Sequence, residues 1–221
     1  MNALLDPIMQ SPQALRYSEE LRRALAREAR ERRRFYNEVR EDQKAEFING
    51  RVVVHSPVTL QHNLVSGRIH RLLATYAQVR SLGTVGHEKL MVRLSRNDYE
   101  PDIVYFGLAK TAGLEPLQRA FPAPDLVVEV LSPSTEANDR GVKLTDYAAH
   151  GVVEYWIVDP DGETIEQYLL EDGRYDLALK LRDGRIESRA VEGFVMPVRA
   201  LFDDDETVAA LRDVLGLTTS G

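Results

Sequence analysis

Residues 126–131 read Leu-Val-Val-Glu-Val-Leu, a short apolar run that carries one carboxylate, Glu129. Its length is typical of a strand, and apolar side chains on both alternating faces indicate a strand covered on both sides. A buried carboxylate is costly unless it is paired, hydrogen-bonded or bound to a metal. Glu129 is therefore either half of a buried ion pair with one of the many arginines or part of a functional site.

Alternating strand and helix patterns surround this run. Asn49-Gly50 between two apolar segments predicts a β-hairpin over residues 45–56. Over residues 59–80, apolar residues at helical spacing form one stripe. The chain is predicted to be a mixed α/β domain with one central sheet, helices against it and hairpins toward the C-terminus. The other predicted elements are strands at 84–94 (one, or two with a break near Gly86), 103–106, 153–158, 164–170 and 175–181, and helices at 18–41, 142–150 and 206–215.

The composition excludes several classes of protein. The chain has 221 residues, which fits one ordinary domain better than two small ones. It has no Cys, which excludes disulfides, thiolate metal sites, iron–sulfur clusters and cysteine nucleophiles. No apolar run is long enough to span a membrane, and no signal-peptide pattern begins the chain. We therefore expect a soluble cytoplasmic protein.

Charge is distributed unevenly along the chain. Residues 16–44 hold ten basic and seven acidic residues, a net charge of +3, which leaves −10 for the remainder of a chain whose net charge is −7. A basic character over the whole chain, the simplest mark of a nucleic-acid-binding protein, is absent. The arginine-rich segment is predicted to be a helix that lies on the body of the protein or projects from it.

A second acid can converge on Glu129. Asp102 stands at the entry of the apolar strand 103–106, and two carboxylates on adjacent strands can bind one hard cation, which prefers oxygen ligands. A turn residue after Pro101 is the plainer interpretation of Asp102. The rival acid, Asp125, lies four residues from Glu129 on the same strand, about 13 Å away at the strand rise, so it is too far to share an ion.

A lysine on the next predicted helix could complete such a site. Lys143 and Tyr147 are four residues apart and therefore share a helix face. A lysine beside a metal-bound water could orient the nucleophile or offset charge in the transition state, although a lysine on such a helix is usually a surface residue. Together with Asp102 and Glu129, this set fits metal-assisted phosphodiester hydrolysis. No phosphate-binding glycine loop, HExxH or GxSxG motif competes with that interpretation.

The order of these motifs resembles the Uma family, known as "putative restriction endonucleases" and long classed as a domain of unknown function within the PD-(D/E)xK nuclease superfamily. Four segments carry the most specific part of the resemblance. They are Glu-Pro-Asp-Ile-Val-Tyr-Phe (100–106), Ala-Pro-Asp-Leu-Val-Val-Glu-Val-Leu-Ser-Pro-Ser-Thr (123–135), Lys-Leu-Thr-Asp-Tyr-Ala-Ala-His-Gly-Val (143–152) and Glu-Tyr-Trp-Ile-Val-Asp-Pro (154–160). The hairpin segment 45–57 is also similar, and the resemblance extends over about residues 45–200.

The resemblance implies a restriction-endonuclease-like α/β core, with a central mixed sheet flanked by helices, and an Mg²⁺ site for which we expect Mn²⁺ to substitute. It implies that Asp102 and Glu129 are the two acids of the motif and the metal ligands. Glu46, on the first hairpin, becomes an additional candidate acid, and His62 a candidate neighbour of the site, although a histidine on an apolar helix face is more often a core residue. The predicted division is an N-terminal helical extension at 1–44 and the nuclease-like domain at 45–221.

The sequence departs from the superfamily at its lysine. That lysine normally follows the second acid by two residues, where this chain has Leu131. Lys143 could bring its amine into the same space from the following helix. A second departure is the long arginine-rich segment before residue 45, which is either a solvated helix or oligomer contact, or a contact to the DNA backbone.

The resemblance favours an Mg²⁺-dependent endonuclease acting on DNA, with Asp102, Glu129, Lys143 and Glu46 as catalytic residues. Because duplex cleavage needs two cuts and superfamily enzymes often pair, we expect a homodimer. The first alternative, which Leu131 motivates, is a nucleic-acid-binding module of the same fold without catalysis. The second is a structural protein in which an arginine neutralises Glu129.

Overall fold

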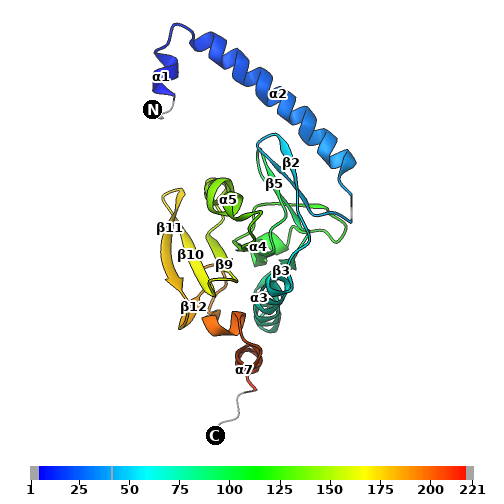
Figure 1. Cartoon of the computed structure of the whole chain (residues 1–221), viewed down its shortest axis with the longest axis vertical. Coiled ribbons are helices and arrows are strands. Elements are labelled where there is room, and N and C mark those ends of the chain that lie inside the picture. Colours follow the sequence, from blue (N-terminus) through cyan, green and yellow to red (C-terminus); the bar gives the residue numbers. More distant parts are fainter. Residues whose placement is uncertain (1–4, 41, 218–221) are drawn as a thin grey trace.

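The structure is a computed structural model that describes residues 5–40 and 42–217 (Figure 1). Helices and strands alternate along most of the chain, and none of the described helices combines the length and apolar character needed to cross a membrane. The elements are α1 (Asp6–Met9), α2 (Ala14–Glu38), β1 (Ala45–Ile48), β2 (Arg51–Val54), α3 (Leu60–Val79), β3 (Gly83–His87), β4 (Met91–Arg93), β5 (Asp98–Tyr99), β6 (Ile103–Gly107), α4 (Leu108–Thr111), β7 (Ala120–Phe121), β8 (Leu126–Val130), α5 (Glu136–Asn138), η1 (Asp139–Lys143), α6 (Leu144–Ala149), β9 (Glu154–Asp159), β10 (Thr164–Glu171), β11 (Arg174–Leu181), β12 (Arg185–Glu187), β13 (Val195–Pro197), η2 (Val198–Leu201) and α7 (Asp204–Val214).

A six-stranded mixed sheet in the order β11-β10-β9-β8-β6-β3 forms the centre of the molecule. Strand β8 pairs parallel to β9 and antiparallel to β6, so the predicted strand 126–131 lies in the interior of the sheet and all five residues of β8 are buried. Its side chains alternate between two cores. Leu126, Val128 and Val130 face the cluster that includes α3, whereas Val127 and Leu131 belong to the cluster on the opposite face.

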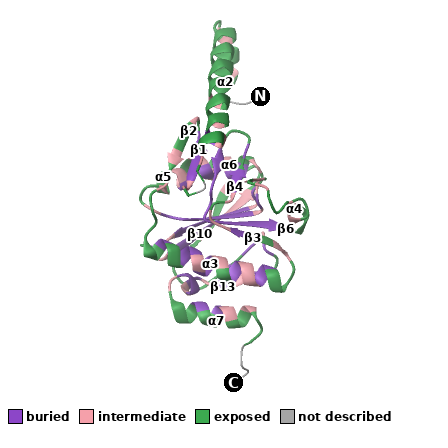
Figure 2. Cartoon of the chain, turned by 90° about the vertical axis from the view of Figure 1, so that its right-hand side faces the viewer, coloured by how far each residue is buried: buried purple, intermediate pink, exposed green. Residues whose placement is uncertain are grey.

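Helix α3 covers one face of this sheet, with α7 packed beside it at the end of the molecule opposite α2 (Figures 1 and 2). Thr59 caps the helix by accepting a hydrogen bond from the backbone N–H of His62. The apolar stripe predicted from the sequence is buried throughout, with Val65, Ile69, Leu72, Leu73 and Tyr76 all in the core.

A second, five-stranded sheet in the order β2-β1-β5-β4-β7 lies on the other side. It begins with the predicted hairpin, in which Asn49 and Gly50 both have positive φ (49° and 81°), as a type I′ turn requires. Alternation again divides the side chains of β1, because Ala45 and Phe47 face α2 while Ile48 faces the central sheet.

The mixed α/β class with sheets flanked by helices is confirmed, but the expectation of one central sheet was wrong. Residues 84–94 form two strands in different sheets, because the chain turns at residues 88–90 with Glu88 and Lys89 at positive φ (49° and 53°). The hairpin β10–β11 extends the six-stranded sheet as its edge, and β12 and β13 form a small sheet of their own. The two-residue strands β5 and β7 were missed because they are too short to show periodicity.

Helix α2 projects from one end of the molecule (Figures 1 and 2). It begins at Ala14, four residues before the predicted start at Ser18, and only Phe35 is buried along its 25 residues. Its C-terminal half is attached to the second sheet by two ion pairs, Arg32 with the fully buried Asp98 (2.7 Å) and Arg96 with Glu28 (2.7 Å). The position of a domain boundary at residue 45 stays a prediction.

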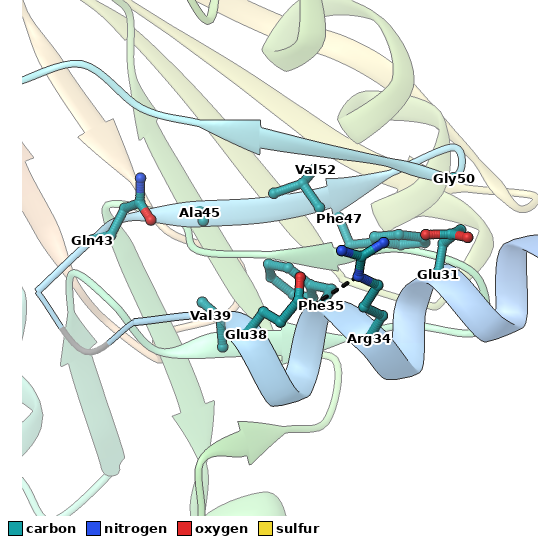
Figure 3. Close-up of a pocket in the computed structure, with 10 residues that line it drawn as sticks. All are labelled: Glu31, Arg34, Phe35, Glu38, Val39, Gln43, Ala45, Phe47, Gly50 and Val52. Atoms are coloured by element: carbon teal, nitrogen blue, oxygen red, sulfur yellow. Dashed lines mark hydrogen bonds and ion pairs between the residues drawn. The ribbon is translucent and has the colours of Figure 1, made fainter.

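Phe35 anchors α2 to the hairpin β1–β2 (Figure 3). Its ring packs against that of Phe47, with centroids 5.8 Å apart. A pocket of about 420 Å³ opens beside this contact, where Arg34 and Glu38 form an ion pair across one helical turn (2.8 Å). The attachment of α2 thus combines one buried aromatic contact with charged contacts around it.

We expect Phe35→Ala to lower the free energy of unfolding by about 3–5 kcal/mol, because it removes a buried ring and leaves a cavity. Leu21→Ala on the same helix is the matched control, since Leu21 is 60% exposed and its truncation should change stability little. Urea denaturation followed by circular dichroism measures both. Equal stability of the Phe35 variant and wild type would show that this contact does not hold α2 to the body.

Candidate active site

Strand alternation brings three carboxylates to one interior face. Glu46 lies on β1 beside Ile48, Asp102 precedes β6, and Glu129 lies in the middle of β8. The register pairs Ile103 with Val128, so its continuation by one residue places Asp102 opposite Glu129. The backbone N–H of Val130 donates a hydrogen bond to Asp102 Oδ2 (2.8 Å). The two acids that the sequence predicts to be neighbours therefore are neighbours, and both are buried.

Lys143 forms ion pairs with two of these acids and with a fourth acid, Asp139. Its amine lies 3.0 Å from Glu46 Oε1, 2.9 Å from Glu129 Oε1 and 2.9 Å from Asp139 Oδ1. The general expectation of a surface lysine was wrong, since Lys143 is 1% exposed. It ends a single widened helical turn, Asp139–Lys143, a distortion that recurs at functional sites. Tyr147, one turn later, donates its hydroxyl to Glu129 Oε1 (3.2 Å).

Asp102 is held by two basic side chains on the other side of the cluster. Lys44 Nζ lies 2.7 Å from Asp102 Oδ1, and His62 Nε2 lies 3.4 Å from Asp102 Oδ2. His62 thus contacts the site, as its position at the N-terminal end of α3 suggested. Lys44 was missed as a site residue. It is the last basic residue of the arginine-rich segment and stands directly before the hairpin that carries Glu46.

Glu46 has its own histidine. His55 Nε2 lies 3.1 Å from Glu46 Oε2, and the backbone N–H of Glu100 donates to Glu46 Oε1 (2.9 Å). His55 directly follows β2 and Glu46 lies on β1, so both members of this pair come from the same hairpin. The sequence analysis missed His55 and Asp139, and only the hairpin register, which pairs Ala45 with Val54, offered a signal for His55.

The other sequence predictions near the site are also resolved. Asp125 lies at the far end of β8, where it pairs with Lys110 (2.7 Å) and accepts a hydrogen bond from the backbone N–H of Gly107 (2.8 Å), so it is no part of the cluster. Leu131, at the usual position of the superfamily lysine, is buried in the apolar core. The partner of Glu129 is Lys143, not an arginine.

Comparison with known proteins assigns the chain to a family. The model of the Uma2 family, described as "Putative restriction endonuclease", matches residues 29–199, more than three quarters of the chain. The chain belongs to the Uma2 family. The resemblance found in the sequence is thereby confirmed, and the match begins within α2.

Two further proteins are similar to this Uma2 chain. An uncharacterised protein of Synechocystis sp. is 28% identical over 142 residues, which are 61% of this chain and 70% of that protein. A crystal structure from Anabaena variabilis, titled a putative nuclease belonging to DUF820, superposes with a TM-score of 0.67 at 17% identity and covers 78% of this chain and 96% of that one. The second comparison shows that the two chains share a fold.

Asp102 and Glu46 ionise readily although both are buried. Burial opposes their ionisation, but hydrogen bonding to His62 and the charge of Lys44 outweigh it and hold the pKa of Asp102 well below its usual value. In the same way the charges of Lys143 and His55 outweigh burial and lower the pKa of Glu46 to about 2. Both side chains are therefore carboxylates at neutral pH.

Glu129 behaves in the opposite way. Burial raises its pKa well above the usual value; the charge of Lys143 opposes this effect, and the neighbouring carboxylates add to it. Burial also disfavours the charged form of Lys143, yet the surrounding carboxylates reverse this and raise its pKa well above that of an exposed lysine. One ammonium therefore serves several acids, and Glu129 is the acid of this cluster whose pKa is raised.

A small cavity of about 20 Å³ opens beside Asp102 and is lined by Lys44, His55, His62 and the loop after β8. A volume of about 10–15 Å³ suffices for one water, provided that polar partners surround it. The site therefore has room for a water directly beside the carboxylate of Asp102.

The donor atoms of the cluster fit a hard divalent cation. Asp102 and Glu129 present carboxylate oxygens from adjacent positions, and Mg²⁺ is typically held by one or two carboxylates together with waters and substrate phosphates. Asp139 Oδ2 is buried without a hydrogen bond, which leaves one oxygen donor available beside the cluster. Within residues 5–40 and 42–217, no group of three or more His, Asp or Glu side chains is already arranged around a common point for a metal.

We expect Lys143→Met to lower the free energy of unfolding at pH 7 by about 3–5 kcal/mol, because it leaves several buried carboxylates without a cation. Lys110→Met is the matched control, since it removes a lysine from a partly exposed pair with Asp125 and should cost no more than about 1 kcal/mol. Urea denaturation of both variants provides the comparison. A cost for Lys143→Met as small as that of the control would contradict the shared-cation arrangement.

The raised pKa of Glu129 makes stability depend on pH with a definite sign. Because the folded state keeps a proton that the unfolded chain releases near pH 4.5, the free energy of unfolding should fall as pH rises from 4.5 through the raised folded-state pKa. Glu129→Gln should lose this fall, since glutamine does not titrate. Denaturant titrations of both proteins between about pH 4.5 and 8 measure the difference. Parallel curves of unfolding free energy against pH would contradict the raised pKa of Glu129.

Proposed function

We propose that this Uma2 protein is an Mg²⁺-dependent endonuclease that hydrolyses phosphodiester bonds in DNA. The observation that carries the proposal is the convergence of Asp102, Glu129, Glu46 and Lys143, from four different elements, on one buried cluster. Such a cluster is costly for a protein that needs only a stable fold. Membership of a family described as restriction endonucleases supports phosphodiester hydrolysis as the reaction.

In this proposal Asp102 and Glu129 hold the cation, and Glu46 contacts it or its waters. The chemistry that Mg²⁺ supplies when bound is charge neutralisation on the phosphate and a lower pKa for a water. The ammonium of Lys143 orients the attacking water and offsets negative charge that develops in the transition state. His62 and Lys44 position Asp102, and Tyr147 positions Glu129, through the contacts already described.

Lys143 takes the place of the superfamily lysine in this mechanism. Its amine lies 2.9 Å from Glu129 Oε1, although it comes from the helical segment after β8 and not from the position of Leu131. This geometry favours an active enzyme over the alternative of a nucleic-acid-binding module that has lost catalysis. The homodimer stays a prediction from the requirement for two cuts in a duplex.

Calorimetric titration with Mg²⁺ and Mn²⁺ tests the two proposed ligands. We expect wild type to bind either ion, and Asp102→Asn and Glu129→Gln to bind at least about tenfold more weakly, because each loses a charged oxygen ligand. Asp125→Asn, directly before strand β8 and outside the cluster, should bind as wild type. Thermal denaturation of each variant confirms that it is folded, and equal affinity in all four proteins would refute this metal site.

Substrate phosphates often complete an Mg²⁺ site, so the titration is repeated with an uncleavable phosphorothioate duplex. The same proteins are then assayed on plasmid DNA, where the two cluster variants should lose more than about 100-fold in rate while Asp125→Asn retains the wild-type rate. DNA binding by wild type without metal binding or cleavage would favour the non-enzymatic module.

A further inference from the structure

A cavity larger than the one beside Phe35 and the one beside Asp102 lies outside the carboxylate cluster. It has a volume of about 620 Å³ and lies between the C-terminal end of α2 and strands β4 and β7. This size is within the range of roughly 300–1,000 Å³ that is typical of small-molecule pockets. Neither the family description nor the proposed mechanism assigns it a role.

The charge on its wall differs from that of the whole chain. Among the residues that the structure describes, four cations, Arg40, Lys89, Arg93 and Arg119, line it together with one acid, Glu100, whereas the chain has a net charge of −7. The pocket on the other side of α2 has the opposite balance, with Arg34 between Glu31 and Glu38 (Figure 3). Positive charge is thus concentrated on one side of the helix.

Arg93 is a surplus cation in this wall. The buried Asp98 beside it already binds Arg32 at 2.7 Å, and Arg93 Nε lies 3.9 Å from Asp98 Oδ1. Half of the Arg93 side chain is exposed, and its guanidinium lies over the ring of Tyr36 at 4.4 Å. Within the described part of the chain, Arg40 pairs with the exposed Asp42, a contact that a phosphate can replace at little cost. Lys89 and Arg119 have interactions of their own, which leaves Arg93 and Arg40 as the cations for a ligand.

Apart from Gln43 and Gln118, the remaining wall is apolar and aromatic. Phe121, Tyr36 and Met91 line the cavity, and an aromatic ring beside an arginine is the arrangement on which unpaired bases stack while their phosphates are bound. A double helix cannot enter a cavity of this volume, but one nucleotide can.

The cavity also adjoins the carboxylate cluster. Glu100 lines the cavity, its backbone N–H donates to Glu46 Oε1 (2.9 Å), and Asp102 follows two residues later, no more than about 7 Å along the chain. On the other wall, the backbone N–H of Glu88 donates to the carbonyl of Asp102 (2.9 Å) next to Lys89. The wall of the cavity and Asp102 are therefore separated by only two residues of chain.

We propose that this cavity binds an unpaired nucleotide of the substrate strand, with its base against Phe121 and its phosphate on Arg93 and Arg40. The inference deepens the proposed nuclease function and rests on it for the identity of the ligand. It assigns this protein a preference for DNA with a single-stranded segment next to the cleavage site.

Fluorescence anisotropy in EDTA tests this without metal or cleavage. The probes are a blunt labelled duplex, the same duplex with a three-nucleotide overhang, and dTMP as a competitor. Wild type should bind the overhang duplex at least about fivefold more tightly than the blunt one, the effect expected for one stacked base. Equal binding of the two duplexes would overturn the proposal, and dTMP binding as tightly as the overhang would show that a free nucleotide is the ligand instead.

Two variants locate the effect. Phe121→Leu keeps apolar volume but removes the ring, and Arg93→Gln removes the charge; each should abolish the overhang preference while thermal denaturation shows a folded protein. Arg212→Gln, exposed on α7 at the opposite end of the molecule, should retain it. Persistence of the preference in both cavity variants would refute the site. If the preference holds but the metal titration fails, the metal-dependent nuclease proposal fails and the nucleotide site does not.

Discussion

The ammonium of Lys143 is the interaction on which the interior of this protein depends. A single buried cation lies within 3.0 Å of carboxylates from β1, β8 and the helical segment after β8. Without it, burial of these acids would be strongly unfavourable. The two sheets and the helical layer thus meet at one charge, and the apolar cores on both sides of β8 shield it from bulk solvent. The same desolvation that makes the cluster costly also strengthens every electrostatic contact within it.

The alternation of side chains along β-strands explains why the carboxylates of the site lie on one face. Within β8, Leu126, Val128 and Val130 pack toward α3, which leaves Glu129 on the opposite face with Val127. The same rule turns Glu46 inward beside Ile48. Asp102 and Glu129 could therefore be predicted from local patterns, because each stands in or next to a short apolar strand and those strands pair in the sheet.

Lys44 could not be predicted as a site residue, because its contact with the site is long-range. Lys44 meets Asp102 across 58 residues of chain, and no local pattern records that contact. The burial of Lys143 depends on the packing of α6 against the second sheet, whereas its sequence context indicates only a helix. Residues 84–94 are divided between two sheets by a turn with positive φ at Glu88 and Lys89. Glu and Lys seldom adopt positive φ, so the sequence does not predict this turn.

An acidic protein can still bind nucleic acid if its positive charge is local. The net charge of −7 sets the long-range field, but phosphates respond to cations within about one Debye length, roughly 8 Å at physiological salt. Here the cations cluster where α2 meets β4 and β7, beside the backbone segment that leads to Asp102. Repulsion by the remaining surface then disfavours loose binding along a duplex, whereas a strand that enters this one region meets favourable charge. Under the proposed nucleotide site, a preference for one DNA structure follows from that contrast, since the acidic body of the protein offers no general attraction to DNA.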